Sequence, residues 1–184
     1  MNKDENLYFI AIIPQHKLCD EINSFKNDFA TRFNSKKALK LPPHITLKAP
    51  FKLTTNAHDS LLQWFANLRF SGKAFSIELK DFGAFQNGYH PVVFINPVMN
   101  TELSLMQKEI ITGFKNYFPA QAEHSDSKFR PHLTIAYRDL TLQKFREAWK
   151  EYKTKSFHAI FEVTGIYLLQ HDTRQWNIIL KNSL

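Results

Sequence analysis

The sequence predicts an α+β fold built from two similar halves, and two short matching strings are the first observation behind this prediction. Residues 43–47 read Pro-His-Ile-Thr-Leu and residues 131–135 read Pro-His-Leu-Thr-Ile, so His44 and His132 lie 88 positions apart in a chain of 184 residues. The second observation is that strand and helix patterns recur in the same order around each string. A chain of this length forms one domain, or two small lobes that share a core.

The first half is predicted to run strand, helix, strand, helix, strand. An apolar run without helix stop signals predicts a strand over residues 7–13, and apolar residues at three- and four-residue steps predict a helix over residues 18–33. The pair Pro42-Pro43 ends any helix and opens the first string as a strand. A short helix over residues 61–68 and an alternating strand over residues 75–80 follow.

The second half repeats this order and adds a closing hairpin. A turn signal separates the halves, and the second string again begins as a strand after a proline. The predicted elements are a turn at residues 86–89, a strand at 92–95, a helix at 103–117, a strand from 131, a helix at 142–152, and a hairpin formed by 157–169 and 176–180.

Three anchors align the halves and predict an internal repeat of approximately residues 7–85 and 91–180. Phe9-Ile10 recurs as Phe-Ile 85 positions later, His44 recurs 88 positions later and Phe75 recurs 82 positions later. The small differences fall in predicted loops, as expected for a duplicated unit of secondary structure.

Composition narrows the class of protein. The formal net charge of +7 favours anionic partners such as nucleic acid, nucleotides or acidic membranes. A single cysteine, Cys19, excludes an internal disulfide framework and a thiolate-rich metal site, and fits a reducing cytoplasm. Because there is no apolar run of about 18 residues and the N-terminus is polar, we expect a cytoplasmic protein without a membrane span or secretory signal.

The spacing within each string predicts a polar face. Residues i and i+2 of a strand point to the same side, so His44 shares a face with Thr46, and His132 shares one with Thr134. The aliphatic residues between them point to the other side, toward a helix layer. Each histidine lies about 6–7 Å from its threonine along the strand, a distance that a phosphate can bridge.

Two imidazoles on one phosphate suit phosphoester chemistry that needs no metal and no cofactor. One neutral histidine takes a proton from the attacking hydroxyl while a protonated one gives a proton to the leaving oxygen, and the threonines hold the non-bridging oxygens. A single His-x-Thr is more often a core histidine, but two copies in equivalent halves favour a site. A metal site is less supported, because neither string has a nearby carboxylate and the other six histidines form no cluster with ligand spacing.

The paired His-x-Thr strings resemble the 2H phosphoesterase superfamily, and within it the 2′-5′ RNA ligase-like and cyclic phosphodiesterase branch. The resemblance implies one bilobal domain of residues 1–184, with two pseudo-symmetric lobes, each an antiparallel sheet backed by helices, around a central cleft. It also implies that His44 and His132 are the catalytic acid and base, and that Thr46 and Thr134 hold the phosphate.

The activities that the resemblance implies all act on phosphoesters without metal or ATP. They are the opening of 2′,3′-cyclic phosphates to 2′-phosphates, the hydrolysis of related cyclic phosphates such as ADP-ribose 1″,2″-cyclic phosphate, and reversible 2′-5′ joining of RNA ends. We therefore expect a monomer whose partners are RNA ends or nucleotide cyclic phosphates. Two alternatives stay open: a non-catalytic module that binds RNA ends or nucleotides, and a phosphodiesterase for a small cyclic-phosphate metabolite.

Four further residues are candidates for substrate binding. Lys48 has the strand parity of the first motif and Arg138 that of the second, while Arg130 directly precedes the second motif. Cations on the cleft face would favour a phosphate, although a solvated charge at a strand end is the plain alternative for each. Tyr89, in the predicted hairpin loop, is the best exposed candidate for stacking on a base.

Overall fold

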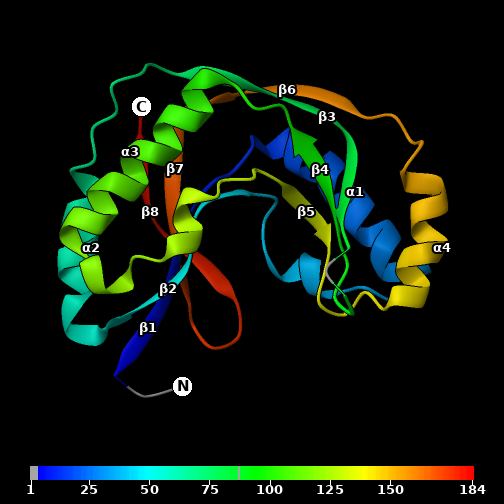
Figure 1. Ribbon diagram of the computed structural model, residues 1–184, viewed down its shortest axis with the longest axis horizontal. Helices are drawn as coiled ribbons and strands as arrows, with labels where there is room; N and C mark the ends of the chain where they lie inside the picture. The colour runs from blue at the N-terminus through cyan, green and yellow to red at the C-terminus, as the bar shows by residue number, and fades with distance from the viewer. Residues whose placement is uncertain (1–3, 87) are drawn as a thin grey trace.

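The computed structural model describes residues 4–86 and 88–184 and has the predicted α+β architecture (Figure 1). The predicted turn at residues 86–89 lies partly outside the described residues, because Asn87 is not among them. The strands are β1 Glu5–Ile12, β2 Ile45–Thr54, β3 Phe75–Phe85, β4 Val92–Pro97, β5 Leu133–Ala136, β6 His158–Val163, β7 Gly165–His171 and β8 Trp176–Ser183. The α-helices are α1 His16–Arg32, α2 His58–Ala66, α3 Thr101–Tyr117 and α4 Leu142–Tyr152.

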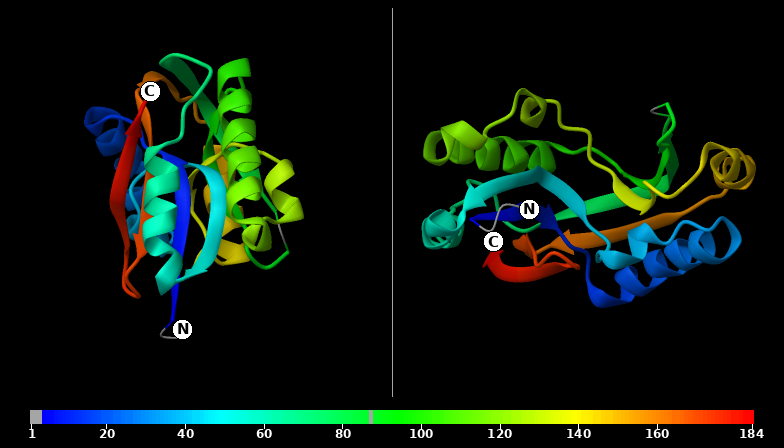
Figure 2. Two further views of the ribbon diagram at one scale, coloured as in Figure 1. Left: turned by 90° about the vertical axis from the view of Figure 1, so that its left-hand side faces the viewer. Right: turned by 90° about the horizontal axis from the view of Figure 1, so that it is seen from below.

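The described strands form one curled sheet in which all neighbours are antiparallel, in the order β6-β3-β4-β5-β2-β1-β7-β8. The sheet divides into two four-stranded halves that meet only where β2 pairs with β5. Helices α2 and α3 lie at one end of the molecule, and α1 and α4 lie at the other (Figure 2). The predicted fold of two lobes, each an antiparallel sheet backed by helices, is therefore confirmed.

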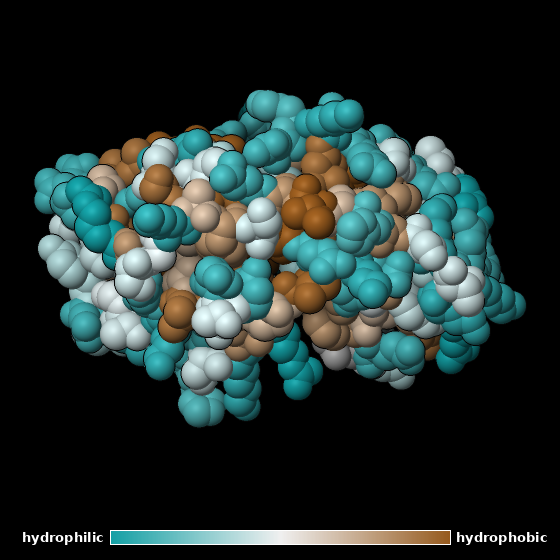
Figure 3. Space-filling model, turned by 90° about the horizontal axis from the view of Figure 1, so that it is seen from above, coloured by the Kyte–Doolittle hydropathy of each residue, from teal (hydrophilic) through white to brown (hydrophobic). Residues whose placement is uncertain are grey.

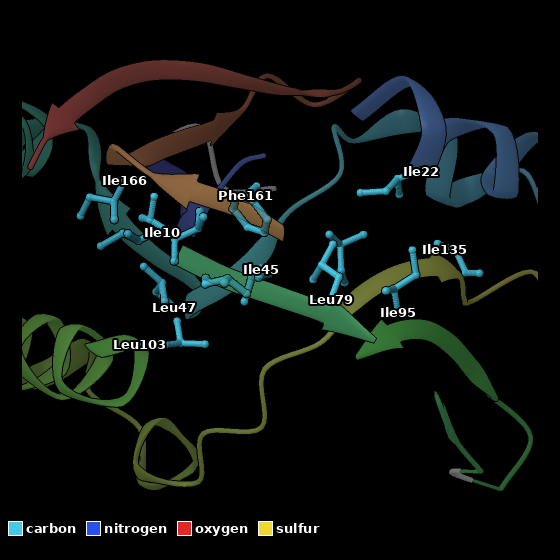
Figure 4. Close-up of a cluster of buried hydrophobic side chains, with 14 of the residues drawn as sticks. Ile10, Ile22, Ile45, Leu47, Leu79, Ile95, Leu103, Ile135, Phe161 and Ile166 are labelled. Atoms are coloured by element: carbon cyan, nitrogen blue, oxygen red, sulfur yellow. The ribbon is translucent and has the colours of Figure 1, made fainter. Parts of the chain in front are cut away.

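Each lobe is covered by a helix that follows a strand of the other lobe in the sequence. Helix α1 follows β1 but packs on β5, and α3 follows β4 but packs on β2. Apolar side chains from both lobes consequently merge into one core, in which Ile22 of α1 and Leu103 of α3 face strand residues such as Ile45 and Ile135 (Figure 4). The exchange holds the two lobes together.

The surface is largely hydrophilic in the view from above, with apolar side chains gathered near the middle of that face (Figure 3). Among the residues that the structure describes, no helix combines the length and apolar character that crossing a membrane requires.

The first motif strand contains a β-bulge that corrects the placement of Lys48. The register of β2 against β1 shifts between Thr46 and Lys48, so that Leu47 and Lys48 are both buried. Lys48 does not share the cleft face with His44, and the prediction that it binds substrate there is wrong. Its ammonium lies in the core, 3.1 Å from a carboxylate oxygen of Asp126, with both side chains fully enclosed.

The second motif strand has a bulge at the matching place. The register of β5 against β4 shifts between Thr134 and Ala136, and Ile135 and Ala136 are both buried. The two motif strands therefore share one local geometry, in which alternation ends one residue after the threonine. Ala136 occupies the position that Lys48 has in the first lobe, so this buried cation belongs to one lobe alone.

Two of the sequence anchors need correction. Ile10 pairs with Lys48 at the first bulge, and Val93 pairs with Ala136 at the second. Ile10 and Val93 are therefore equivalent, which places β1 and β4 83 positions apart rather than 85. The match of Phe75 with Phe157, which directly precedes β6, is wrong, because β3 and β6 pair with each other and β7 holds the place of β3 in the other lobe. The repeat limits of residues 7–85 and 91–180 stay a prediction.

The predicted closing hairpin is only partly correct. Residues 157–169 are not one arm, because β6 ends at Val163 on the far edge of the sheet and β7 begins at Gly165 beside β1. Only β7 and β8 form the hairpin. A Cβ atom at Gly165 would lie 2.5 Å from the Asn182 carbonyl oxygen, so this close approach of backbones requires glycine and marks the break.

Replacing Asp126 with alanine is predicted to destabilise the fold by about 3–5 kcal/mol, because it leaves the Lys48 ammonium buried without a counter-charge. Urea unfolding followed by circular dichroism measures this loss. Adding Lys48→Met to the Asp126→Ala protein should recover part of it. A single variant as stable as the wild type would contradict a structural role for this ion pair.

Candidate active site

The pairing of β2 with β5 brings the two motifs together. Ile45 lies opposite Leu133 in an antiparallel register. The residue before one member of such a pair falls opposite the residue after the other, so His44 lies beside Thr134. The same holds in reverse for the second histidine and the first threonine. Each imidazole therefore has a hydroxyl from the other motif as its neighbour.

All four motif side chains line one pocket of about 220 Å³ between the lobes. The predicted cleft face of both motifs is thus a single site, as the alternation of each strand indicated. The pocket wall also carries aromatic and basic side chains, among them Phe9, Lys26, Tyr137, Arg138 and Trp176.

Both imidazoles are held by the same local hydrogen bond. Nδ1 of His44 lies 2.8 Å from the carbonyl oxygen of Pro42, and Nδ1 of His132 lies 2.8 Å from that of Arg130. A carbonyl oxygen only accepts, so each Nδ1 carries the proton and donates it. The free nitrogen of each ring is Nε2, which is a proton acceptor when the ring is neutral and a donor when it is charged.

Burial keeps the His44 ring neutral at physiological pH. Loss of solvent around its ring is the largest cause that lowers its pKa, from 6.5 to about 4. The Pro42 carbonyl opposes this shift, while the positive charges of Lys26 and His132 add to it. His44 is therefore suited to accept a proton at Nε2.

Phenylalanine rings pack against both imidazoles. The Phe9 ring centre lies 5.1 Å from that of His44, and the Phe85 and Phe94 centres lie 5.2 Å and 5.6 Å from that of His132. These contacts come from β1 on one side and from β3 and β4 on the other. Packing and the Nδ1 hydrogen bond together fix each ring orientation before substrate arrives.

Two aspartates fix the segments that precede the motifs. Asp139, just after β5, accepts hydrogen bonds from the Ser35 hydroxyl at 2.9 Å and from the backbone N–H groups of Lys36 and Lys37 at 2.9 Å and 3.0 Å. Asp126 holds the segment before β5 through its ion pair with β2. The segment before the first motif is thereby tied to the residues just after β5, and the segment before the second motif is tied to β2.

Lys26 is a pocket residue that sequence reasoning missed. Only 1% of its surface is exposed, and its Nζ donates to the Leu41 carbonyl oxygen at 2.9 Å, beside His44 in the pocket wall. The signal was its position, four residues after Ile22 and three before Phe29 on the buried helix stripe. A charged residue on such a stripe is buried only for a reason.

The remaining candidates are dispersed around the site. Arg138 lines the pocket, with a left-handed backbone (φ 58°) and its guanidinium 5.2 Å from the ring centre of Tyr137. Arg130 lines a neighbouring pocket of about 330 Å³, which shares Thr46 and His132 with the first. Tyr89 is 85% exposed and lines neither pocket. Within the described ranges, no three His, Cys, Asp or Glu side chains are grouped to hold a metal.

The fold and the paired site define the 2H phosphoesterase class, and comparison with known proteins gives the family. The model of the 2′-5′ RNA ligase superfamily matches residues 14–175. The chain therefore belongs to this superfamily, a group of phosphoesterase enzymes, and the resemblance seen in its motifs is confirmed.

Relatives and solved structures agree with this assignment. The chain is 25% identical over 170 residues to a Bacillus cytotoxicus protein named "Putative phosphoesterase", covering 92% of this chain and 91% of that one. The fold of this chain is similar to that of TT0787 of Thermus thermophilus, with a TM-score of 0.70, 17% identity and 97% of both chains covered. It is equally similar to E. coli LigT solved with 3′-AMP, with a TM-score of 0.70, 14% identity and coverage of 98% and 99%.

The hydrogen bonds at Nδ1 predict an uncommon pair of tautomers. At a pH where both imidazole rings are neutral, nitrogen-15 NMR should show a protonated Nδ1 and an unprotonated Nε2 for His44 and for His132. On lowering the pH, the His44 signals should titrate near pH 4, well below the ordinary value of 6.5, because burial penalises the charged ring. Nε2–H tautomers in both rings, or titration of His44 near 6.5, would contradict the described geometry.

Proposed function

We propose that the protein is a metal-independent phosphoesterase that opens 2′,3′-cyclic phosphates, of RNA ends or nucleotides, to 2′-phosphates. The observation that carries this proposal is the pair of imidazoles with Nδ1 bound to a carbonyl and Nε2 free, both in the wall of one pocket with two threonine hydroxyls. General acid–base catalysis needs one acceptor and one donor placed around the reacting phosphorus.

The proposed step is in-line displacement by water. The water oxygen bonds to phosphorus as Nε2 of His44 takes its proton. The P–O3′ bond breaks, its electron pair stays on O3′, and that oxygen takes the proton from Nε2 of His132. Thr46 and Thr134 donate hydrogen bonds to the non-bridging oxygens, where negative charge develops. The product is a 2′-phosphate with a free 3′-hydroxyl.

The same arrangement supports 2′-5′ joining of RNA ends. If an RNA 5′-hydroxyl replaces water, the identical bond changes leave a 2′-5′ phosphodiester and a free 3′-hydroxyl, and the reverse reaction regenerates the cyclic phosphate. Crystals of the similarly folded LigT hold 3′-AMP, NADP⁺, ATP or phosphate, which supports a nucleotide or RNA end as the ligand of this chain. The basic net charge of +7 fits such anionic partners.

A small cyclic-phosphate metabolite is the second candidate substrate. The pocket around the motifs, at about 220 Å³, is smaller than the roughly 300–1,000 Å³ of most ligand sites, which fits a small substrate. Its wall includes the edge-to-face pair of Phe9 and Trp176, whose ring centres lie 4.6 Å apart. An aromatic wall of this kind accommodates a nucleobase, which favours a nucleotide over a metabolite that lacks one.

Substituting either motif histidine with alanine is predicted to lower kcat/KM at least about 100-fold, because each removes one of the two proton-transfer groups. The assay follows release of the 2′-phosphate from 2′,3′-cyclic AMP and from RNA with a 2′,3′-cyclic end, in the presence of chelator. His16→Ala, at an exposed position outside the pocket, is the matched control.

Retained turnover in the His44→Ala or His132→Ala protein would exclude the two-histidine mechanism. Tight binding of both substrates by the wild type without any turnover would favour the alternative of a non-catalytic binding module.

A further inference from the structure

Lys26 is a buried cation without a counter-charge in the described part of the protein. Its side chain is enclosed between helix α1 and the segment before β2, and the Leu41 carbonyl oxygen takes one of its three N–H donors. No Asp or Glu oxygen of the described residues lies within 4.0 Å of Nζ. Burying an ammonium costs free energy unless an anion or further acceptors compensate.

The compensating anion has a place, because Lys26 lines the pocket that holds both motifs. We propose that Lys26 is a substrate-binding residue whose ammonium pairs with a phosphate oxygen on the His44 side of the cleft. This inference rests on the proposed function, in which a phosphate occupies the pocket. It adds a ligand that the motif pattern does not contain.

On the other side of the site, helix α3 contributes a buried amide rather than a cation. Helix α3 contributes Gln107, which is buried, lines the neighbouring pocket beside His132, and donates from Nε2 to the Asp126 carbonyl oxygen at 2.9 Å. Both helices thus send a polar side chain to the segment that precedes a motif, but only α1 sends a charge. Lys26 therefore places a buried positive charge on the His44 side of the cleft.

A buried positive charge in the pocket wall favours a dianion over a monoanion. A cyclic phosphodiester carries one negative charge, whereas the 2′-phosphate product carries up to two, so the product gains more from a nearby ammonium. Lys26 therefore contributes more to binding of the phosphomonoester than to binding of the cyclic substrate. The ligand class that it favours most is therefore a nucleotide with a terminal phosphomonoester, the product of the proposed reaction.

The ionisation of Lys26 sets a pH limit on this contact. Burial lowers its pKa from 10.5 to about 8, and the nearby Cys19 opposes that shift. The other titratable or charged groups around the pocket are His44, His132, Tyr137 and Arg138. Because the ammonium is lost as pH rises through about 8, affinity for the phosphomonoester should fall there.

The test is calorimetric binding of 2′-AMP and inorganic phosphate to wild type and Lys26→Met, whose side chain keeps the apolar stem and loses the charge. At pH 7 the variant should bind 2′-AMP about 10- to 100-fold more weakly, the scale of one charge-assisted hydrogen bond. The KM for 2′,3′-cyclic AMP should rise by a smaller factor. Lys17→Met removes an exposed charge from the same helix and is the matched control.

Two further measurements keep the inference falsifiable. If Lys26→Met does not fold, the pH dependence of 2′-AMP binding by the wild type decides, because affinity that stays constant between pH 7 and pH 9 overturns the proposal. Lys26→Arg should restore binding in part, since it returns a positive charge. Equal affinity of Lys26→Met and wild type for 2′-AMP also overturns it. Binding of phosphate without turnover would refute the proposed reaction and leave Lys26 as a phosphate ligand.

Discussion

The antiparallel pairing of β2 with β5 is the constraint on which the rest of the structure depends. These strands alone join the two halves of the described sheet, through the registered pair of Ile45 and Leu133. A slip of one residue in either strand would turn its histidine and threonine into the core and its aliphatic residues into the pocket. The register at this pairing is therefore what turns two separate motifs into one site.

The bulges show how the strands limit their polar face to two residues. Beyond Thr46 and Thr134, each strand gains one residue relative to its neighbour, and the next two side chains both enter the core. The cleft thus receives one imidazole and one hydroxyl from each lobe, while the aliphatic residues still anchor the helices. Exchange of α1 and α3 between lobes, with the ties at Asp126 and Asp139, holds this arrangement in place.

Local pattern was enough to predict most elements and the core of the site. Helix stripes and strand alternation depend on residues close in the sequence, and the shared face of His44 and Thr46 follows from strand geometry alone. Lys48 was misplaced because a bulge is set by the register of a neighbouring strand. Lys26 was missed because its burial depends on the segment that closes over α1. The break at Gly165 was missed because an apolar run does not reveal which neighbouring strand each of its parts joins.

Titration of the protein with inorganic phosphate, followed through the NMR signals of both motif histidines, tests the central claim most directly. One phosphate between two half-sites predicts that the His44 and His132 rings respond together, with a single dissociation constant and a stoichiometry of one. Alanine at either threonine should weaken the response of both rings. Independent dissociation constants for the two histidines, or a response of only one ring, would contradict a shared site.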